Sequence, residues 1–197
     1  MGGSSRRFGT ILGVLLIGAF ADIRPAAARG TDGSWEAGAY YFITHPDQES
    51  AIQDVNGGGL RVGWYRKATQ EFEIDYDSGS KIDAIHNASH PLPGVTFDVS
   101  KVSALYVRNY QPKGHDNLSP ILLFGVGQIF IDNGTKTSNK SLLRAGGGFK
   151  YFFSPHVALR FDASIFSWYG DGDTVPLTRL YAFDVNLGVS VLFGGKK

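Results

Sequence analysis

The hydrophobic pattern near the end of the chain has a period of two. In residues 181–193 (YAFDVNLGVSVLF) the odd positions carry large apolar side chains, and the even positions carry small or polar ones. Such alternation indicates a β-strand with two different faces, and helical spacing fits it badly. A strand in a soluble protein averages about 5 or 6 residues, whereas a strand that crosses a bilayer at a tilt needs about 9 to 11. The length of this segment therefore favours a membrane-spanning strand.

Seven further segments are expected to form strands, and no amphipathic helix is expected between them. The facing of two of them is left open. In one segment Lys101 and Arg108 fall on opposite phases, and the other segment is apolar on both phases. These two segments are residues 97–110 and 119–131. In the remaining strands the phase that carries charges is opposite to the apolar phase. Those strands are residues 35–42, 58–65, 71–76, 141–152 and 157–169.

The connections between these strands are expected to alternate in length. Residues 66–70 and 153–156 are short turns, and residues 111–118 form a longer connection on the same side. On the other side we expect four long polar loops, at residues 43–57, 77–96, 132–140 and 170–180. Short turns at one end and long loops at the other are typical of a bacterial outer-membrane barrel. Closure is favoured because hydrocarbon leaves no partner for an unpaired strand edge.

Aromatic residues near the predicted strand ends fit two interfacial girdles. The candidates are Trp35, Tyr40, Tyr41, Trp64, Tyr65, Tyr76, Tyr110, Tyr151, Trp168, Tyr169 and Tyr181. The alternative is a soluble β-sandwich in which these aromatic side chains form the core.

The first 28 residues have the features of a secretory signal peptide. Arg6 and Arg7 precede an apolar run at residues 8–21, and three alanines at 26–28 supply a small-residue cleavage pattern. The apolar run is shorter than the roughly 20 residues of a transmembrane helix. We therefore expect two parts, a signal peptide at residues 1–28 and one barrel domain at residues 29–197, exported through the general secretory pathway.

Composition excludes several functional classes. The chain has no cysteine, which rules out a disulfide-stapled module, a cysteine-ligated zinc site and a thiol enzyme. Its formal net charge of +1 is too balanced for a protein that binds nucleic acid through phosphates, so no nucleic-acid partner is expected. The 26 glycines fit close strand approach and bending better than a phosphate-binding loop, because no GK[ST] sequence follows them.

Three stretches resemble the OmpA-like family of small outer-membrane β-barrels: LSPILLFGVG (118–127), LRAGGGFKYFFSPHVALRFDAS (143–164) and NLGVSVLFGG (186–195). The resemblance implies an all-β, eight-stranded antiparallel up-and-down transmembrane β-barrel in a Gram-negative outer membrane. It also implies assembly by the barrel-assembly machinery, which reads the last strand. The residues that match this assembly signal are Tyr181, Val189, Val191 and Phe193. Four residues follow Phe193, which departs from the family pattern, and no peptidoglycan-binding domain is expected.

An eight-stranded barrel has an interior that its own side chains fill. Alternation points nine charged residues inward, where opposite charges are expected to pair because unpaired buried charge is costly. They are Glu36, Arg61, Glu73, Asp75, Arg144, Lys150, Arg160, Asp162 and Asp184. Structural filling is the favoured role of this network, and a gated small-ion pathway is the alternative.

No catalytic, cofactor-binding or metal-binding residues are expected. All five histidines (His45, His86, His90, His115 and His156) lie in predicted loops or turns, and none lies on a predicted strand. Ser154 and His156 share a short turn at the periplasmic end, away from lipid of the outer leaflet. His86 and His90 stand four apart near Asp83, but without a helix this spacing is weak evidence for a metal site.

The expected function is therefore a structural or surface-interaction role carried by the four long outer loops. Expected partners are outer-membrane lipid and lipopolysaccharide, the assembly machinery and a surface partner at the loops. Two alternatives remain open. One is a lipid-modifying outer-membrane enzyme of the deacylase or acyltransferase type, and the other is a soluble periplasmic barrel that binds a ligand among inward-facing apolar residues.

Overall fold

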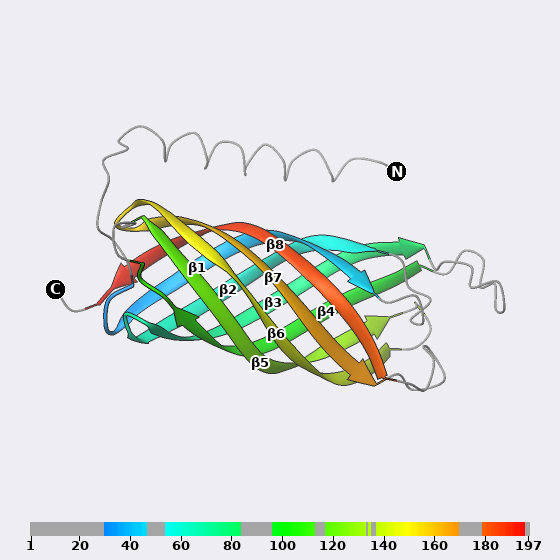
Figure 1. The fold of residues 1–197 in the computed structure, drawn as a ribbon. Helices are drawn as coiled ribbons and strands as arrows, with labels where there is room; N and C mark the ends of the chain where they lie inside the picture. The colour runs from blue at the N-terminus through cyan, green and yellow to red at the C-terminus, as the bar shows by residue number, and fades with distance from the viewer. Residues whose placement is uncertain are drawn as a thin grey trace, which may run out of the picture.

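The chain forms a closed barrel of eight antiparallel strands, which confirms the predicted fold class (Figure 1). The structure, a computed structural model, describes residues 30–46, 54–83, 96–112, 117–132, 134, 137–169 and 179–195. Each strand pairs with its neighbours in sequence, and β8 pairs with β1 to close the ring. The strands are β1 (Ser34–Pro46), β2 (Val55–Lys67), β3 (Gln70–Asp83), β4 (Thr96–Asn109), β5 (Leu118–Asp132), β6 (Thr137–Ser154), β7 (Val157–Tyr169) and β8 (Arg179–Gly194).

The two ends of the barrel carry different connections. At one end, here called the turn end, residues 68–69, 110–117 and 155–156 join consecutive strands, and β1 begins and β8 ends there (Figure 1). At the other end, the loop end, the chain continues through residues 47–54, 84–95, 133–136 and 170–178. The predicted signal peptide lies outside the described residues. Within the described residues, no helix is long and apolar enough to cross a membrane.

Several strands extend further toward the loop end than their hydrophobic pattern indicates. β1 continues to Pro46 and therefore includes His45, so the prediction that no histidine lies on a strand was wrong. The predicted loops at 43–57 and 77–96 are likewise shortened by β1, β2 and β3, and most of the predicted loop at 132–140 belongs to β5 and β6. Backbone pairing continues past the residues that alternate strictly, for example at Thr44 and Val55, so the alternation ends before the hydrogen-bonded ladder does.

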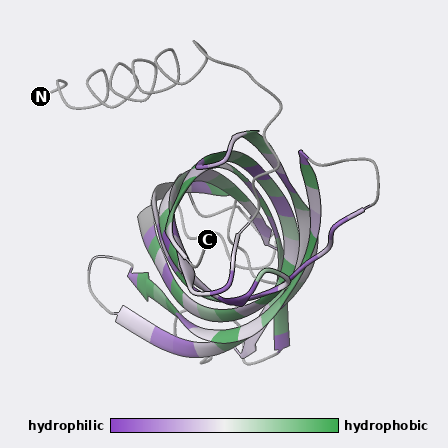
Figure 2. Ribbon diagram, turned by 90° about the vertical axis from the view of Figure 1, so that its left-hand side faces the viewer, coloured by the Kyte–Doolittle hydropathy of each residue, from purple (hydrophilic) through white to green (hydrophobic). Residues whose placement is uncertain are grey.

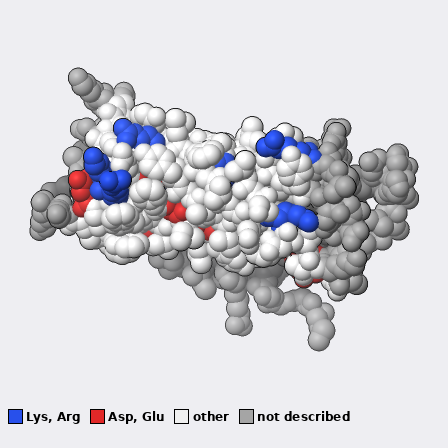
Figure 3. Space-filling model, turned by 90° about the horizontal axis from the view of Figure 1, so that it is seen from below, with Lys and Arg blue, Asp and Glu red and all other residues white. Residues whose placement is uncertain are grey.

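The outer wall is apolar and the lumen is polar at its centre. Viewed along the axis (Figure 2), the strands form a ring on which hydrophilic and hydrophobic residues alternate. Large apolar side chains such as Leu60, Ile74 and Phe124 are about 60% exposed on the outer face. On the face seen from below (Figure 3), most of the visible Lys and Arg side chains lie toward the two ends, and the band between them is mostly uncharged.

The structure settles the facing of the two strands that the sequence left open. In β4 the inward phase carries Lys101, Ser103, Leu105, Val107 and Asn109. The inward phase of β5 includes Ile121 and Leu123, which pack with Leu105 and Val107 as a cluster inside the barrel. β5 is thus apolar on both faces because one face belongs to the exposed apolar outer wall and the other meets this inner cluster.

Three of the predicted girdle aromatics instead lie inside the barrel. Tyr40, Tyr65 and Trp168 are buried, with exposed fractions of 6%, 1% and 3%. The hydroxyl of Tyr40 donates to Asp77, that of Tyr65 donates to Glu36, and Trp168 stacks on Phe166. Each polar group of these tyrosines thus finds a partner in the lumen. The remaining candidates are exposed on the outer face: Trp35, Tyr41, Trp64, Tyr76, Tyr110, Tyr151, Tyr169 and Tyr181.

Two glycines of the Gly146–Gly147–Gly148 run permit close approach of β6 to β7. A Cβ atom at Gly146 would lie 2.3 Å from the carbonyl oxygen of Ala163, and one at Gly148 would lie 2.0 Å from that of Phe161. Real side chains cannot occupy that space without moving the strand backbone. These glycines therefore serve strand packing, as the sequence suggested.

Candidate functional site

The barrel interior holds a cluster of buried charges, which we call the lumen network. All nine charged residues that alternation pointed inward lie inside the barrel, each no more than 3% exposed. The structure adds Glu71, Asp77 and Lys101 to them. These three residues were not among the predicted inward charges for different reasons. Glu71 shares its phase with Glu73 but stands beside a predicted turn. Asp77 fell within a predicted loop, and Lys101 lies on a strand whose facing the sequence left open. The continuing phase of β3 is the signal that could have identified Glu71 and Asp77.

Lys150 organises the part of the network nearest the turn end. Its Nζ atom lies 2.6 Å from Glu36 Oε2 and 2.8 Å from Glu71 Oε2, and it donates to the hydroxyl of Tyr65 at 2.8 Å. The Tyr65 hydroxyl in turn donates to Glu36 Oε2 at 2.8 Å. Asn109 Nδ2 donates to Glu71 Oε2 at 3.1 Å. One ammonium group therefore joins carboxylates from β1 and β3 to β6 across the lumen.

Arg160 forms the centre of the network. Both terminal nitrogens of its guanidinium contact the carboxylate of Glu73, and its Nε donates to Asp162 Oδ2 at 3.0 Å. Arg61 Nη1 reaches the same Asp162 oxygen at 3.1 Å, and Asn186 Nδ2 donates to the other oxygen at 2.8 Å. The two-pronged contact with Glu73 uses the fork geometry of arginine, which a lysine cannot reproduce.

Arg144 and Lys101 carry the network toward the loop end. Arg144 Nη1 lies 3.3 Å from Asp75 Oδ2, and its Nε donates to Ser164 Oγ at 2.9 Å. Lys101 Nζ lies 2.6 Å from Asp184 Oδ2 and 3.3 Å from Asp77 Oδ2. The charges thus form a continuous column along the axis. Lys101, Arg144, Lys150 and Arg160 each bridge carboxylates of different strands, whereas among the described carboxylates Arg61 contacts Asp162 alone.

Apolar clusters close the lumen on both sides of this column. At the turn end Tyr65, Phe152, Ala158 and Leu192 pack together. At the loop end a larger cluster is formed by Tyr40, Phe42, Val55, Val99, Ile129, Ile131, Leu142, Phe166, Trp168, Leu180 and Ala182. The ammonium of Lys101 lies 4.8 Å from the centre of the Phe42 ring and 4.6 Å from that of Phe166. The ion pairs are therefore held between two apolar layers, where water screening is weak.

The network contains more carboxylates than cations. Its acidic members are Glu36, Glu71, Glu73, Asp75, Asp77, Asp162 and Asp184, and its basic members are Arg61, Lys101, Arg144, Lys150 and Arg160. Glu36, Glu71 and Glu73 each place an oxygen within 4.8 Å of the others, a spacing compatible with a cation. Lys150 and Arg160 already contact these three carboxylates. The cluster is thus organised as an ion-pair network around protein cations.

The described histidines are not paired with a nucleophile. The hydroxyl of Ser154 accepts the backbone N–H of His156 at 3.3 Å, while the ring Nδ1 of His156 lies 3.1 Å from the carbonyl of Leu192. His45 Nδ1 lies 2.8 Å from Asp54 Oδ1 on the exposed surface. The candidate pair His86 and His90, together with His115, lies outside the described residues, as does the side chain of Asp83.

The four residues of the expected assembly signal lie on the outer face of β8. Tyr181, Val191 and Phe193 are each close to half exposed, and Val189 is partly exposed. β8 pairs with β1 and with β7 over its length. The signal residues therefore project away from the lumen network.

Comparison with known proteins supports a location in the outer membrane. No family model matches the chain. Outer membrane porin F of Pseudomonas fluorescens is 25% identical over 178 residues, which cover 86% of this chain and 50% of that protein. This chain is a small outer-membrane β-barrel. It spans about half the length of the curated relative that it matches.

Solved structures share the fold of this outer-membrane barrel. The outer membrane protein OprG of Pseudomonas aeruginosa superposes with a TM-score of 0.58 at 10% identity, covering 86% of this chain and 99% of OprG. Neisserial surface protein A superposes with a TM-score of 0.55 at 17% identity, covering 81% of this chain and 96% of that protein. The predicted localisation in a Gram-negative outer membrane is confirmed, and the apolar outer wall is the face that meets lipid.

Proposed function

We propose that this outer-membrane barrel is a non-enzymatic scaffold that presents the loop end to partners at the cell surface. Outer-membrane barrels place their short turns in the periplasm and their longer connections outside. The loop end of this chain therefore faces the exterior, and the turn end, with both strand termini, faces the periplasm. Binding in such proteins is carried by loops on a rigid framework.

The closed lumen is the observation that carries this proposal. Twelve charged side chains, each buried, tie the strands together along the axis, and apolar clusters flank them on both sides. Moving an ion through this column requires breaking pairs that have little water around them. The arrangement therefore favours a rigid scaffold over the gated small-ion pathway.

Planar-bilayer recording tests the closed scaffold. The purified barrel is expected to give no long-lived open channel, whereas replacing Arg144 and Arg160 together by alanine is expected to produce conductance, because two bulky guanidinium groups leave the lumen. Stable channels in the unmodified protein would contradict the proposal and support the ion pathway.

Lipid A mass spectrometry of the native host, with and without the gene, tests the enzymatic alternative. The scaffold predicts identical acyl-chain patterns in both strains. A deacylated or additionally acylated lipid A that depends on the gene would establish the lipid-modifying alternative. The soluble periplasmic barrel is set aside, because it requires apolar residues inward and polar ones outward, and the outer wall has the opposite character.

A surface partner is tested with the connection at residues 84–95, between β3 and β4. Replacing it by a short Gly-Ser segment is expected to leave the barrel folded and to remove adhesion of cells that display the protein. The matched control is the same replacement at residues 110–117 of the turn end. Equal adhesion by both variants would count against a role for the loop end.

A further inference from the structure

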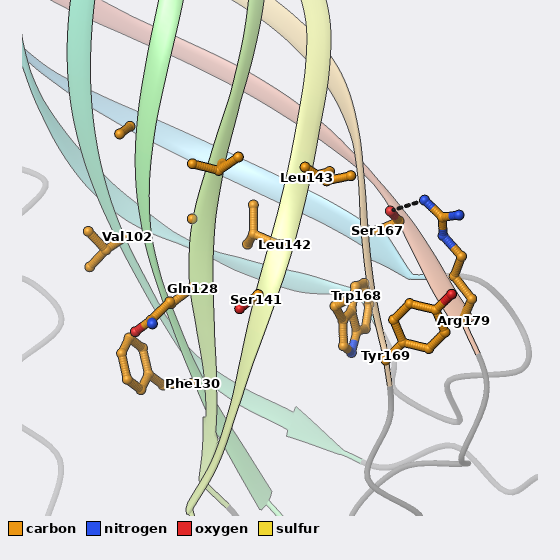
Figure 4. A pocket seen from close by; sticks show the side chains of 13 residues that line it. Val102, Gln128, Phe130, Ser141, Leu142, Leu143, Ser167, Trp168, Tyr169 and Arg179 are labelled. Carbon is orange, nitrogen blue, oxygen red and sulfur yellow. Dashed lines mark hydrogen bonds between the residues drawn. The ribbon is translucent and has the colours of Figure 1, made fainter.

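The outer wall of the barrel has a groove of about 760 Å³ near the loop end. It runs across β4, β5, β6 and β7 and ends at Arg179 on β8 (Figure 4). Its volume lies in the range of about 300 to 1,000 Å³ that is typical of small-molecule sites. The groove is open to the membrane side, so an occupant enters from the lipid.

Small residues and the strand register create this groove. Ala104, Gly127, Ser141 and Ser167 line it among larger apolar neighbours such as Leu143. The ladder pairs β6 with β5 from Thr137 onward, but it pairs β6 with β7 only from Leu142 onward. The wall is therefore indented beside the loop end of β7.

A positive charge stands at the outer end of the groove. Arg179 Nη2 donates to Ser167 Oγ at 3.2 Å, and the guanidinium carbon lies 5.5 Å from the ring centre of Tyr181 and 6.0 Å from that of Tyr169. Figure 4 shows Arg179 pointing back toward Ser167 beside Tyr169. A guanidinium has five N–H donors, of which the bond to Ser167 uses one. Tyr169, Tyr181 and Ser167 thus hold the Arg179 guanidinium in place among the exposed aromatic residues near the loop end.

We propose that the groove binds phosphorylated lipid A of the outer leaflet, with an acyl chain along Val126 and Leu143 and a phosphate at Arg179. The loop end faces the exterior, which places Arg179 where headgroups of outer-leaflet lipid lie. Arginine pairs with phosphate through two parallel hydrogen bonds. The apolar floor and the cation at one end match the two chemically different parts of such a lipid.

A second groove on the same wall provides an internal comparison. It has a volume of about 550 Å³, lies toward the turn end, and is lined mostly by apolar residues such as Trp35, Trp64 and Phe72, with Glu73 as a charged member. The two grooves share Ala104 and Val126. No Lys or Arg lines the described part of this second groove, so it offers acyl-chain contacts without a phosphate ligand.

Native mass spectrometry of the protein in detergent, with added bisphosphorylated lipid A, tests the proposal. Arg179→Gln is expected to weaken lipid A binding about tenfold, the loss of a charged hydrogen-bonded contact. The matched control, Arg66→Gln at the exposed turn end, is expected to bind as the unmodified protein does. Dephosphorylated lipid A and phosphatidylglycerol are expected to bind weakly to all three proteins. The phosphate assignment would be overturned if Arg179→Gln bound lipid A as tightly as the unmodified protein does. It would also be overturned if the unmodified protein bound dephosphorylated lipid A or phosphatidylglycerol as tightly as bisphosphorylated lipid A.

A second pair of variants tests the groove itself. Ala104→Leu fills the floor without changing charge and is expected to reduce lipid A binding several-fold, whereas Ala39→Leu on the outer face of β1 leaves it unchanged. All variants are checked for folding by their migration in unheated gels. Undiminished binding by Ala104→Leu would overturn the proposal. A dimer that disappears in Ala104→Leu, with lipid A binding unaltered, would instead make the groove an interface between two copies.

Discussion

Lys150 Nζ lies 2.6 Å from Glu36 Oε2, although 114 residues separate the two in sequence. The pair joins β6 to β1 through the lumen, and both side chains are fully buried. Lys150 extends the tie to β3 through Glu71. The barrel wall is thus held by backbone ladders around its circumference and by ion pairs across its interior.

Removing the Lys150 ammonium should be costly. Lys150→Met leaves Glu36 and Glu71 without their shared cation in a site that excludes water. Breaking a buried pair in this way costs about 3 to 5 kcal/mol. Urea unfolding of the protein refolded into lipid vesicles measures the change, with the exposed Lys67→Met as control. If Lys150→Met lowered the free energy of unfolding by less than about 1 kcal/mol, instead of the expected cost of about 3 to 5 kcal/mol, the network would contribute little to stability.

Neutralising one carboxylate of the network, in contrast to removing Lys150, should not destabilise the protein. Glu71→Gln keeps an oxygen that can accept from Lys150 and Asn109, while it lowers the excess of buried negative charge. The free energy of unfolding is expected to stay within about 1 kcal/mol of the original or to rise, because the isolated cost of burying a charge is removed. The same urea titration measures the change. If Glu71→Gln lowered the free energy of unfolding as much as Lys150→Met does, the excess of buried carboxylates would not be a cost to stability.

Much of this architecture could be predicted from the sequence. Period-two alternation indicates most of the strands and the nine inward charges, whereas the antiparallel up-and-down order is what the resemblance to OmpA-like barrels implies. Alternation failed where both faces share a character: β5 is apolar on both sides because Ile121 and Leu123 meet other apolar groups inside. Near the loop end β3 continues through Asp77 beyond the membrane pattern, so a lumen residue was assigned to a loop.

The inward tyrosines illustrate a second limit of the sequence. Tyr40 and Tyr41 are adjacent and equally suited to a girdle by composition, but their side chains point to opposite faces. Gly59 makes the inward position of Tyr40 possible, since a Cβ there would lie 2.3 Å from the Tyr40 ring. The register between two neighbouring strands decides which glycine faces a given ring. The hydrophobic pattern of a single strand does not contain this register.

The lipid-facing wall should reject charge in a depth-dependent way. Leu187 stands near the middle of β8, whereas Val191 pairs with Val157 beside the turn end. Leu187→Arg is expected to cost about 2 to 4 kcal/mol, and Val191→Arg about 1 kcal/mol or less. Folding equilibria in vesicles give both values. Equal costs at the two positions would contradict the placement of the bilayer around the middle of β8.

The assembly signal predicts a defect in cells that is absent in vitro. Phe193→Ala removes the terminal aromatic that the assembly machinery is expected to read, whereas Phe183→Ala removes a similarly exposed aromatic earlier on β8. In cells, only Phe193→Ala should lower the fraction of assembled barrel, and both variants should refold alike in vesicles. Normal assembly of Phe193→Ala would show that this residue carries no signal.

Spin-label accessibility along β8 tests the account most directly. The chain has no cysteine, so each single-cysteine variant between residues 182 and 191 carries one nitroxide without background labelling. In lipid vesicles the odd positions should collide frequently with dissolved oxygen and rarely with a water-soluble nickel complex, and the even positions should be shielded from both. This alternation with a period of two is the predicted result. Access of the nickel complex to the odd positions, or equal oxygen collision on both phases, would contradict a membrane barrel with a closed, ion-paired lumen.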